Sequence, residues 1–164
     1  MLLVIEMQRK LAQVIRKNLK ERVAKELPDL NLIKGVNPYP GNLTWSHKYH
    51  TSLTIFVAWL PSPRDESFTF EVGWSRKNRF PEGHFPSISP SNSELEEFRV
   101  RIGLLFSDND FWWDLDPFEL EVADPMRYLQ ATPLETLLAR VDSNLDDAIS
   151  KILQFGIPLL DKIK

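Results

Sequence analysis

Two long stretches of the chain have hydrophobic residues at spacings of three and four, the pattern of an amphipathic helix. The first covers residues 4–27, is rich in basic side chains and ends at Pro28. The second covers Leu134–Phe155, and we expect Gly156 and Pro158 to stop or kink it. The pattern therefore predicts one long helix near each end of the chain.

Four shorter segments between these helices carry strand patterns. Leu43–Tyr49 and Leu53–Leu60 are rich in β-branched and aromatic residues. In Phe68–Trp74 and Phe98–Ile102 apolar and polar residues alternate, so we expect each of these strands to bury one face and expose the other. Arg99 and Arg101 then share the outward face of the last strand.

This order of elements predicts an α+β fold, because the strands follow one another without intervening helices. We expect an antiparallel sheet of four or more strands flanked by the N-terminal and C-terminal helices, which cover one of its faces. The length of 164 residues is that of one domain, so residues 1–164 are assigned to a single α+β domain.

The composition narrows the possible chemistry. With 43% hydrophobic and 26% charged residues the chain should fold, and the absence of cysteine excludes disulfides and thiol nucleophiles. No phosphate-binding loop, dinucleotide fingerprint or hydrolase elbow occurs, so no cofactor is expected. The acidic run from Asp108 to Asp116 does not fit a calcium loop, because Phe111–Trp113 replace the ligands and the glycine, and no metal site is predicted.

Neither a signal peptide nor a membrane-spanning stretch is recognisable. A cytoplasmic location without a membrane partner is therefore the expectation. The net charge of −3 also makes nucleic acid an unfavourable partner.

Charge is unevenly distributed along the chain. Residues 1–50 carry nine basic and four acidic side chains, whereas residues 106–164 carry five basic and twelve acidic ones. The stretch Asp108–Asp124 contains no lysine or arginine. The first helix and the acidic last third could offset each other within the fold, or the acidic stretch could be a surface for a basic partner.

The connection over residues 76–97 is long for a link between two strands, and such loops often carry function. It contains His84, which could act as a general base together with acidic residues. A small hydrolase or a small-ligand-binding protein is therefore one hypothesis for the function.

A second group of candidate residues follows this loop: Arg99, Arg101, Trp112 and Trp113. If they reach the surface, they resemble a protein-binding hot spot, where arginine and tryptophan are enriched. The alternative is a buried tryptophan plug, with the arginines paired to Asp114 or Glu71.

Four short motifs occur in a recognisable order: Phe68-Thr-Phe-Glu-Val-Gly73, Arg99-Val-Arg-Ile-Gly103, Trp112-Trp113-Asp114 and Gly156-Ile-Pro-Leu-Leu-Asp-Lys162. In this order the chain resembles the bacterial family called domain of unknown function 4304. The resemblance implies a first helix, a curved antiparallel sheet, an arginine–glycine strand before a Trp-Trp pair, and a C-terminal helix with Gly-x-Pro. It implies no activity.

The leading hypothesis is therefore a non-enzymatic protein-binding module, for example one of an immunity or antitoxin type. Its acidic surface, with Asp110, Asp114 and Asp116, would meet a basic protein partner by electrostatic complementarity. The oligomeric state is not predicted.

Overall fold

The computed structural model describes residues 2–34, 42–62, 67–77, 96–115 and 133–164, with the backbone alone for residues 2–8. The helices are α1 (Leu2–Glu26), α2 (Gly103–Phe106), α4 (Leu134–Lys151) and α5 (Ile157–Asp161), with a π-helix, η1 (Ile152–Gly156), between the last two. The strands are β1 (Asn31–Leu32), β2 (Leu43–His50), β3 (Leu53–Pro61), β4 (Ser67–Ser75), β5 (Glu97–Arg101) and β6 (Trp113–Asp114).

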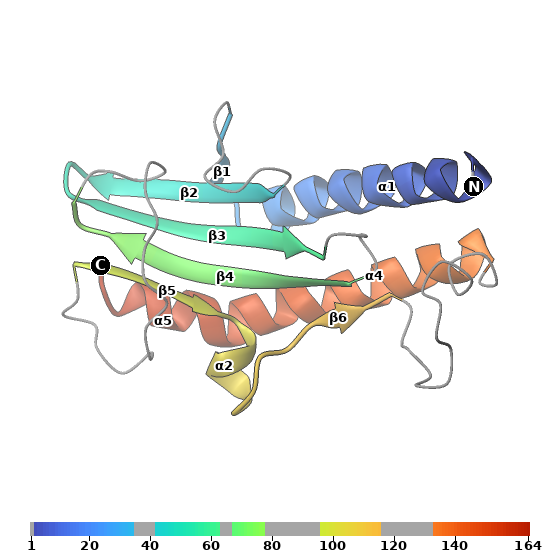
Figure 1. Cartoon of the computed structure of the whole chain (residues 1–164). Helices are drawn as coiled ribbons and strands as arrows, with labels where there is room; N and C mark the ends of the chain where they lie inside the picture. The colour runs from blue at the N-terminus through green and yellow to red at the C-terminus, as the bar shows by residue number, and fades with distance from the viewer. Residues whose placement is uncertain (1, 35–41, 63–66, 78–95, 116–132) are drawn as a thin grey trace.

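The strands form one antiparallel sheet in the order β1-β2-β3-β4-β5 (Figure 1). β6 also pairs with β4, where Phe68 faces Trp113, beyond the part of β4 that pairs with β5. The α+β fold and the four longer strands are thus confirmed. The two-residue strands β1 and β6 were not predicted, because two residues are too few to carry a periodic pattern.

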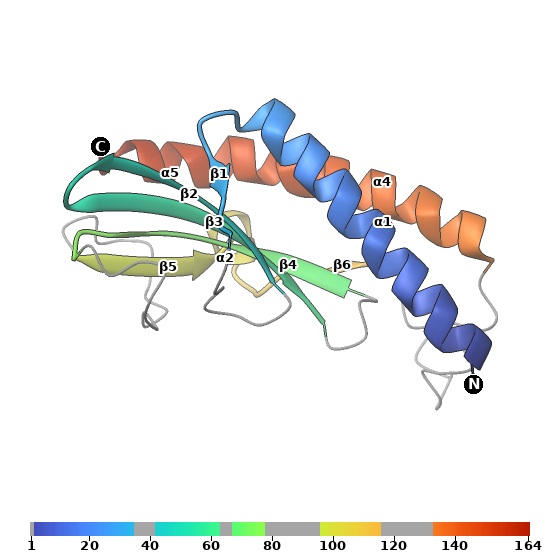
Figure 2. The ribbon, with the colours of Figure 1, turned by 90° about the horizontal axis from the view of Figure 1, so that it is seen from above.

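Both long helices lie on the same face of the sheet, as predicted (Figure 2). α1 and α4 pack against each other. Arg22 of α1 donates to Asp142 at 3.1 Å and also to Asp146, both on α4. The basic first helix therefore pairs with part of the acidic last third of the chain, which is one of the two interpretations of the charge gradient.

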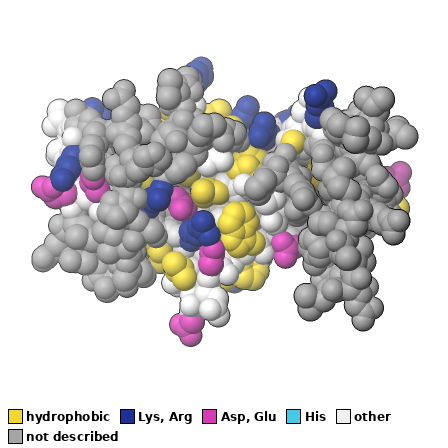
Figure 3. All heavy atoms as spheres, viewed as in Figure 1, with side chains coloured by type: hydrophobic (Ala, Val, Ile, Leu, Met, Phe, Trp, Pro, Cys, Tyr) yellow, Lys and Arg dark blue, Asp and Glu magenta, His cyan; other side chains and the backbone are white. Residues whose placement is uncertain are grey.

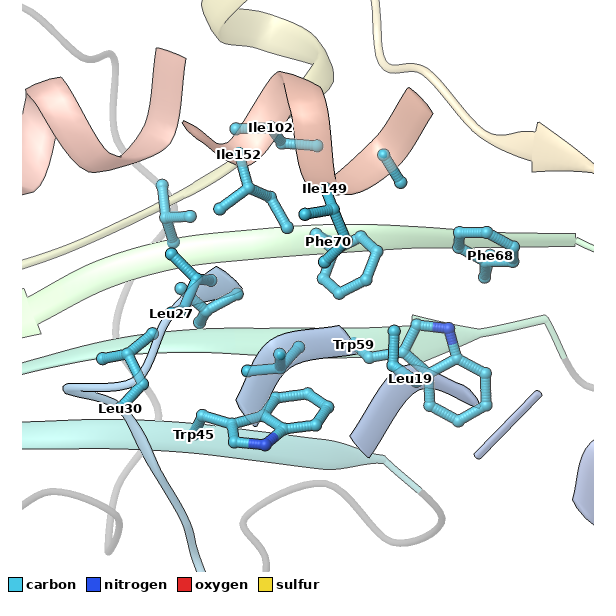
Figure 4. Close-up of a cluster of buried hydrophobic side chains, with 14 of the residues drawn as sticks. Leu19, Leu27, Leu30, Trp45, Trp59, Phe68, Phe70, Ile102, Ile149 and Ile152 are labelled. Carbon is cyan, nitrogen blue, oxygen red and sulfur yellow. The ribbon is translucent and has the colours of Figure 1, made fainter. Parts of the chain in front are cut away.

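Alternate residues of each strand point at the helices and form the hydrophobic core (Figure 4). Trp59 and Phe70 of the sheet meet Leu19 of α1 and Ile149 of α4 in this layer. Further along β4, the ring of Trp74 stacks on Phe98 of β5 with 4.3 Å between the ring centroids, and both side chains are fully buried. The hydrophobic effect on this face therefore holds the helices to the sheet.

Of the two outcomes expected at Gly156 and Pro158, a stop or a kink of the C-terminal helix, the stop does not occur. In η1 the backbone N–H of Ile157 donates to the carbonyl of Ile152, five residues earlier, and helical backbone then continues through α5. A Cβ atom added at Gly156 would lie 3.2 Å from Ile102 and from Val72. The glycine thus lets the helix approach the sheet closely, and it marks a change of helical register instead of an end.

β4 differs from the prediction of a strand with one exposed face. Phe68 to Ser75 are all buried, including Thr69, Glu71 and Ser75, whose side chains point away from the helices. The alternation therefore predicted correctly which residues share a face of β4. It did not predict that the polar residues are buried, because polar side chains can be buried when they form hydrogen bonds.

Candidate functional site

The face of the sheet opposite the helices, here called the polar face, carries the buried polar residues of the described chain. These are Thr44, Thr54, Thr69, Glu71, Ser75 and Glu97. The hydroxyl of Ser75 donates to Glu97 Oε1 at 3.2 Å, and that of Thr69 donates to the carbonyl of Phe111 at 2.8 Å. Internal hydrogen bonds thus offset part of the cost of burying these groups.

Arg99 and Arg101 share this face, as predicted from their spacing. In the β4–β5 register Arg101 lies opposite Glu71, and Arg99 lies opposite Gly73. Arg99 Nη1 is 3.7 Å from Glu71 Oε2, and Arg101 Nε is 3.8 Å from Glu71 Oε1. Of the two acidic partners considered for the arginines, Glu71 is therefore the one that the fold brings to them.

Glu71 is a buried carboxyl group whose pKa is shifted by its surroundings. Its residue is 5% exposed, and burial raises its pKa; Arg101 lowers the pKa and Asp110 raises it, both by smaller amounts. Its Oε2 atom accepts no hydrogen bond from the described residues. Both arginine contacts exceed hydrogen-bonding distance, so the attraction does not offset the loss of hydration.

Arg101 connects this buried carboxylate to the surface. Its Nη1 donates to Asp110, whose Oδ2 also accepts from Trp112 Nε1 at 3.0 Å. The guanidinium lies over the Trp112 ring, 5.3 Å from the centroid, in a cation–π arrangement. Arg101, Asp110 and Trp112 thus hold one another in a fixed, partly exposed cluster.

Trp113 has a different role from its neighbour. It is 3% exposed, stacks on Phe68 with 5.8 Å between centroids, and donates from Nε1 to Asp147 of α4 at 2.8 Å. The backbone of β6 is also bound to α4, because Asn144 donates to the carbonyl of Asp114 at 2.8 Å. The buried-plug interpretation therefore holds for Trp113, whereas Trp112 belongs to the surface.

Two hydrophobic residues in the same stretch of chain as the cluster are exposed, and neither was predicted to be a site residue; the Phe111 ring contacts Phe106 and Trp113. Leu104 of α2 is 40% exposed and Phe111 is 39% exposed. Among the described residues, Leu153 is the other large hydrophobic residue that is exposed. Three consecutive aromatic residues in an extended segment cannot all point inward, and this was the available signal for Phe111–Trp113.

We call Arg101, Leu104, Asp110, Phe111 and Trp112 the arginine–tryptophan surface. On the side of the molecule that bears the polar face, hydrophobic side chains adjoin basic and acidic ones (Figure 3). Asp108 and Asp114, both exposed, follow in the same segment of chain. Partial burial raises the pKa of the Asp114 carboxyl group. Among the described residues, the ion pairs of Arg99 and Arg101 are with Glu71 and Asp110 and not with Asp114.

Two candidate residues, His84 and Asp116, lie outside the described residues, as do residues 78–95 of the long connection. Elsewhere, His47 Nδ1 lies 2.8 Å from the carbonyl of Asp29, and His50 Nδ1 lies 2.9 Å from the hydroxyl of Ser52. Within the described ranges, histidine, aspartate and glutamate side chains form no group of three that could hold a metal ion.

Comparisons of the chain with models of protein families, with curated proteins and with solved structures give no match. The resemblance to the family named above therefore stays a prediction. None of the described helices is both long and apolar enough to span a bilayer.

Proposed function

We propose that this protein is a protein-binding module and that the arginine–tryptophan surface is its contact site. The observation that carries the proposal is the exposure of Leu104 and Phe111, at 40% and 39%, in the same stretch of chain as the paired Arg101 and Trp112. Arginine and tryptophan dominate binding energy in protein interfaces, and partly buried aromatic groups with apolar neighbours are typical of their centres.

The proposed partner has a basic contact surface. The exposed Asp108, Asp110 and Asp114 lie in the same stretch of chain as Phe111, and among the described ion pairs Arg101 offsets Asp110. Such a charge pattern favours a partner rich in lysine and arginine and speeds its association. Neutralisation of a basic toxin by an immunity or antitoxin-like protein is one form of this function.

The fixed geometry of the cluster supports binding with little loss of conformational freedom. Asp110 accepts from both Arg101 and Trp112, so two long side chains are already hydrogen-bonded in the free protein. Side chains that are ordered before binding lose less entropy on association. The cluster can therefore serve as an anchor, while the exposed Leu104 and Phe111 supply apolar area.

The test is a capture experiment in which tagged protein is incubated with lysate of the native host at low and moderate salt. Leu104→Ser is compared with Leu153→Ser, because the two leucines are equally exposed but only Leu104 belongs to the surface. We expect one salt-sensitive partner that wild type and Leu153→Ser retain and Leu104→Ser loses. Equal retention by both variants, or no retained protein, would contradict the proposal.

A further inference from the structure

A small apolar cleft lies at the other end of the fold, between the C-terminal end of α1, strands β2 and β3, and helices η1 and α5. Its volume is about 190 Å³. Its apolar walls are formed by Leu27, Pro28, Leu30, Ile55, Leu153, Ile157 and Leu160. A cleft of this size fits a ligand of a few carbon atoms, since drug-sized ligands occupy roughly 300–1,000 Å³.

The polar residues that line this cleft are mainly acidic. Glu26, Asp29 and Asp161 contribute carboxylates, and Lys164 is the basic residue among the lining residues. Tyr49 adds the face of an aromatic ring. An apolar pocket with acidic groups and an aromatic ring at its edge is complementary to a cation that carries a short hydrocarbon chain.

The protein already holds an ammonium group at this edge. Lys164 Nζ lies 4.6 Å from the centroid of the Tyr49 ring and 2.5 Å from Asp161 Oδ1. The hydrogen bond to Asp161, followed by that to Tyr49, raises the pKa of Lys164. These contacts stabilise a charged ammonium over the ring, and Lys164 thus marks where the head of such a ligand would lie.

The π-helix shapes the wall of the cleft. η1 begins at Ile152, which is buried in the core, and its next residue, Leu153, is 39% exposed and lines the cleft. The change of register then places Ile157 and Leu160 of α5 in the same wall. Single π-helical turns within α-helices are frequent at functional sites, and this one lies beside the cleft.

We propose that this cleft binds a small primary alkylammonium ligand, with its chain among the apolar walls and its ammonium group over Tyr49 beside Asp161. In the free protein Lys164 supplies the ammonium and competes for these two partners. The site is separate from the arginine–tryptophan surface, so it stands or fails independently of the proposed function.

The probe is butylammonium, added to isotopically labelled wild-type protein, with 1-butanol as a neutral compound of the same shape. Amide resonances of residues lining the cleft should shift on titration with butylammonium and shift far less with 1-butanol. Equal shifts with both compounds, or butylammonium shifts confined to residues elsewhere, would overturn the proposal.

Two matched variants test the role of Lys164. Lys164→Met keeps the alkyl chain but removes the competing charge, and Lys162→Met removes the same charge from an exposed residue that does not line the cleft. We expect Lys164→Met to bind butylammonium about tenfold more tightly than wild type. In this variant the ligand no longer has to displace the Lys164 ammonium group from Asp161. Equal affinities for the two variants would contradict competition by Lys164.

Asp161→Asn completes the test, since it removes the carboxylate but preserves the shape of the side chain. Butylammonium affinity should fall about tenfold in this variant. Unchanged affinity would remove Asp161 from the proposed site, and with it the argument that an ammonium group is recognised there.

Discussion

The two faces of the sheet both bury side chains but are stabilised by different interactions. Toward the helices, Trp59, Phe70 and Trp74 pack with apolar partners and are fully buried. On the polar face, Glu71 is buried between two arginines that do not reach hydrogen-bonding distance. Burial of the apolar side chains stabilises the folded state. Burial of Glu71 destabilises the folded state but holds a charged group beside the two arginines.

Under the proposed function, this difference separates the residues that stabilise the fold from those that bind a partner. The apolar face explains why the helices and sheet stay together. On the polar face, Arg101 contacts the partly exposed Trp112, and Phe111, which precedes Trp112, is 39% exposed. We therefore expect substitutions on the apolar face to change the free energy of unfolding, and substitutions at the arginine–tryptophan surface to change partner binding.

The largest effect on stability is expected from Trp74→Ala. It removes a fully buried ring that stacks on Phe98, and such deletions cost about 3–5 kcal/mol. Trp112→Ala is the matched control, because its partly exposed ring makes a cation–π contact with Arg101, worth about 0.5–1 kcal/mol, and a hydrogen bond to the exposed Asp110, worth about 1 kcal/mol. Urea unfolding followed by circular dichroism measures both. Equal losses would mean that the two faces contribute alike.

Gly73→Ala should have an intermediate effect on the free energy of unfolding. The added Cβ would lie 2.2 Å from the carbonyl oxygen of Phe98 and 2.6 Å from Phe56 Cζ, whose ring covers the glycine on the polar face. Overpacking of this kind costs about 1–3 kcal/mol. The double variant with Phe56→Ala should not recover the loss, because the backbone carbonyl remains in place. Full recovery would show that the ring alone excludes a side chain.

Glu71→Gln should have a smaller effect that depends on pH. Because the pKa of Glu71 is raised in the folded protein, the folded state binds more protons than the unfolded chain above the ordinary pKa of 4.5. The free energy of unfolding of the wild type therefore falls as pH rises through the folded pKa. Glutamine cannot ionise, so we expect the variant to be more stable than the wild type at neutral pH and this advantage to vanish in acid.

Urea unfolding at about pH 4 and pH 7 measures this difference. Glu96→Gln is the control, because its exposed carboxylate pairs with Lys77 and should change stability by less than about 0.5 kcal/mol. A Glu71→Gln variant that is less stable than the wild type at neutral pH would show that the arginines outweigh burial.

Much of the fold could be predicted from the sequence, because its elements have strong periodicity. The alternation in Phe68–Trp74 gave the correct two faces of β4, and the spacing of Arg99 and Arg101 placed both on one face. The burial of Glu71 could not be predicted, since exposure depends on what covers a face and not on the pattern along one strand. The close approach of Gly156 to Val72 and Ile102 could not be predicted either, because these residues are distant in sequence.

The candidate site was predicted in part. Arg101 and Trp112 were selected for their residue types, and the fold brings them together. The separation of Trp112 from Trp113 follows from the pairing of β6 with β4, and a two-residue strand carries no sequence signal. The cleft beside Tyr49 was missed, because its residues come from five elements and converge only in the folded chain.

The most direct test of the proposed function is photo-crosslinking in lysate of the native host. A photoreactive phenylalanine analogue is introduced at Phe111 in one variant and at Leu153 in another, two positions that are each 39% exposed. We predict a single protein adduct from position 111 that weakens at higher salt, and no such adduct from position 153. The same adduct from both positions, or an adduct from position 153 alone, would contradict a binding site at the arginine–tryptophan surface.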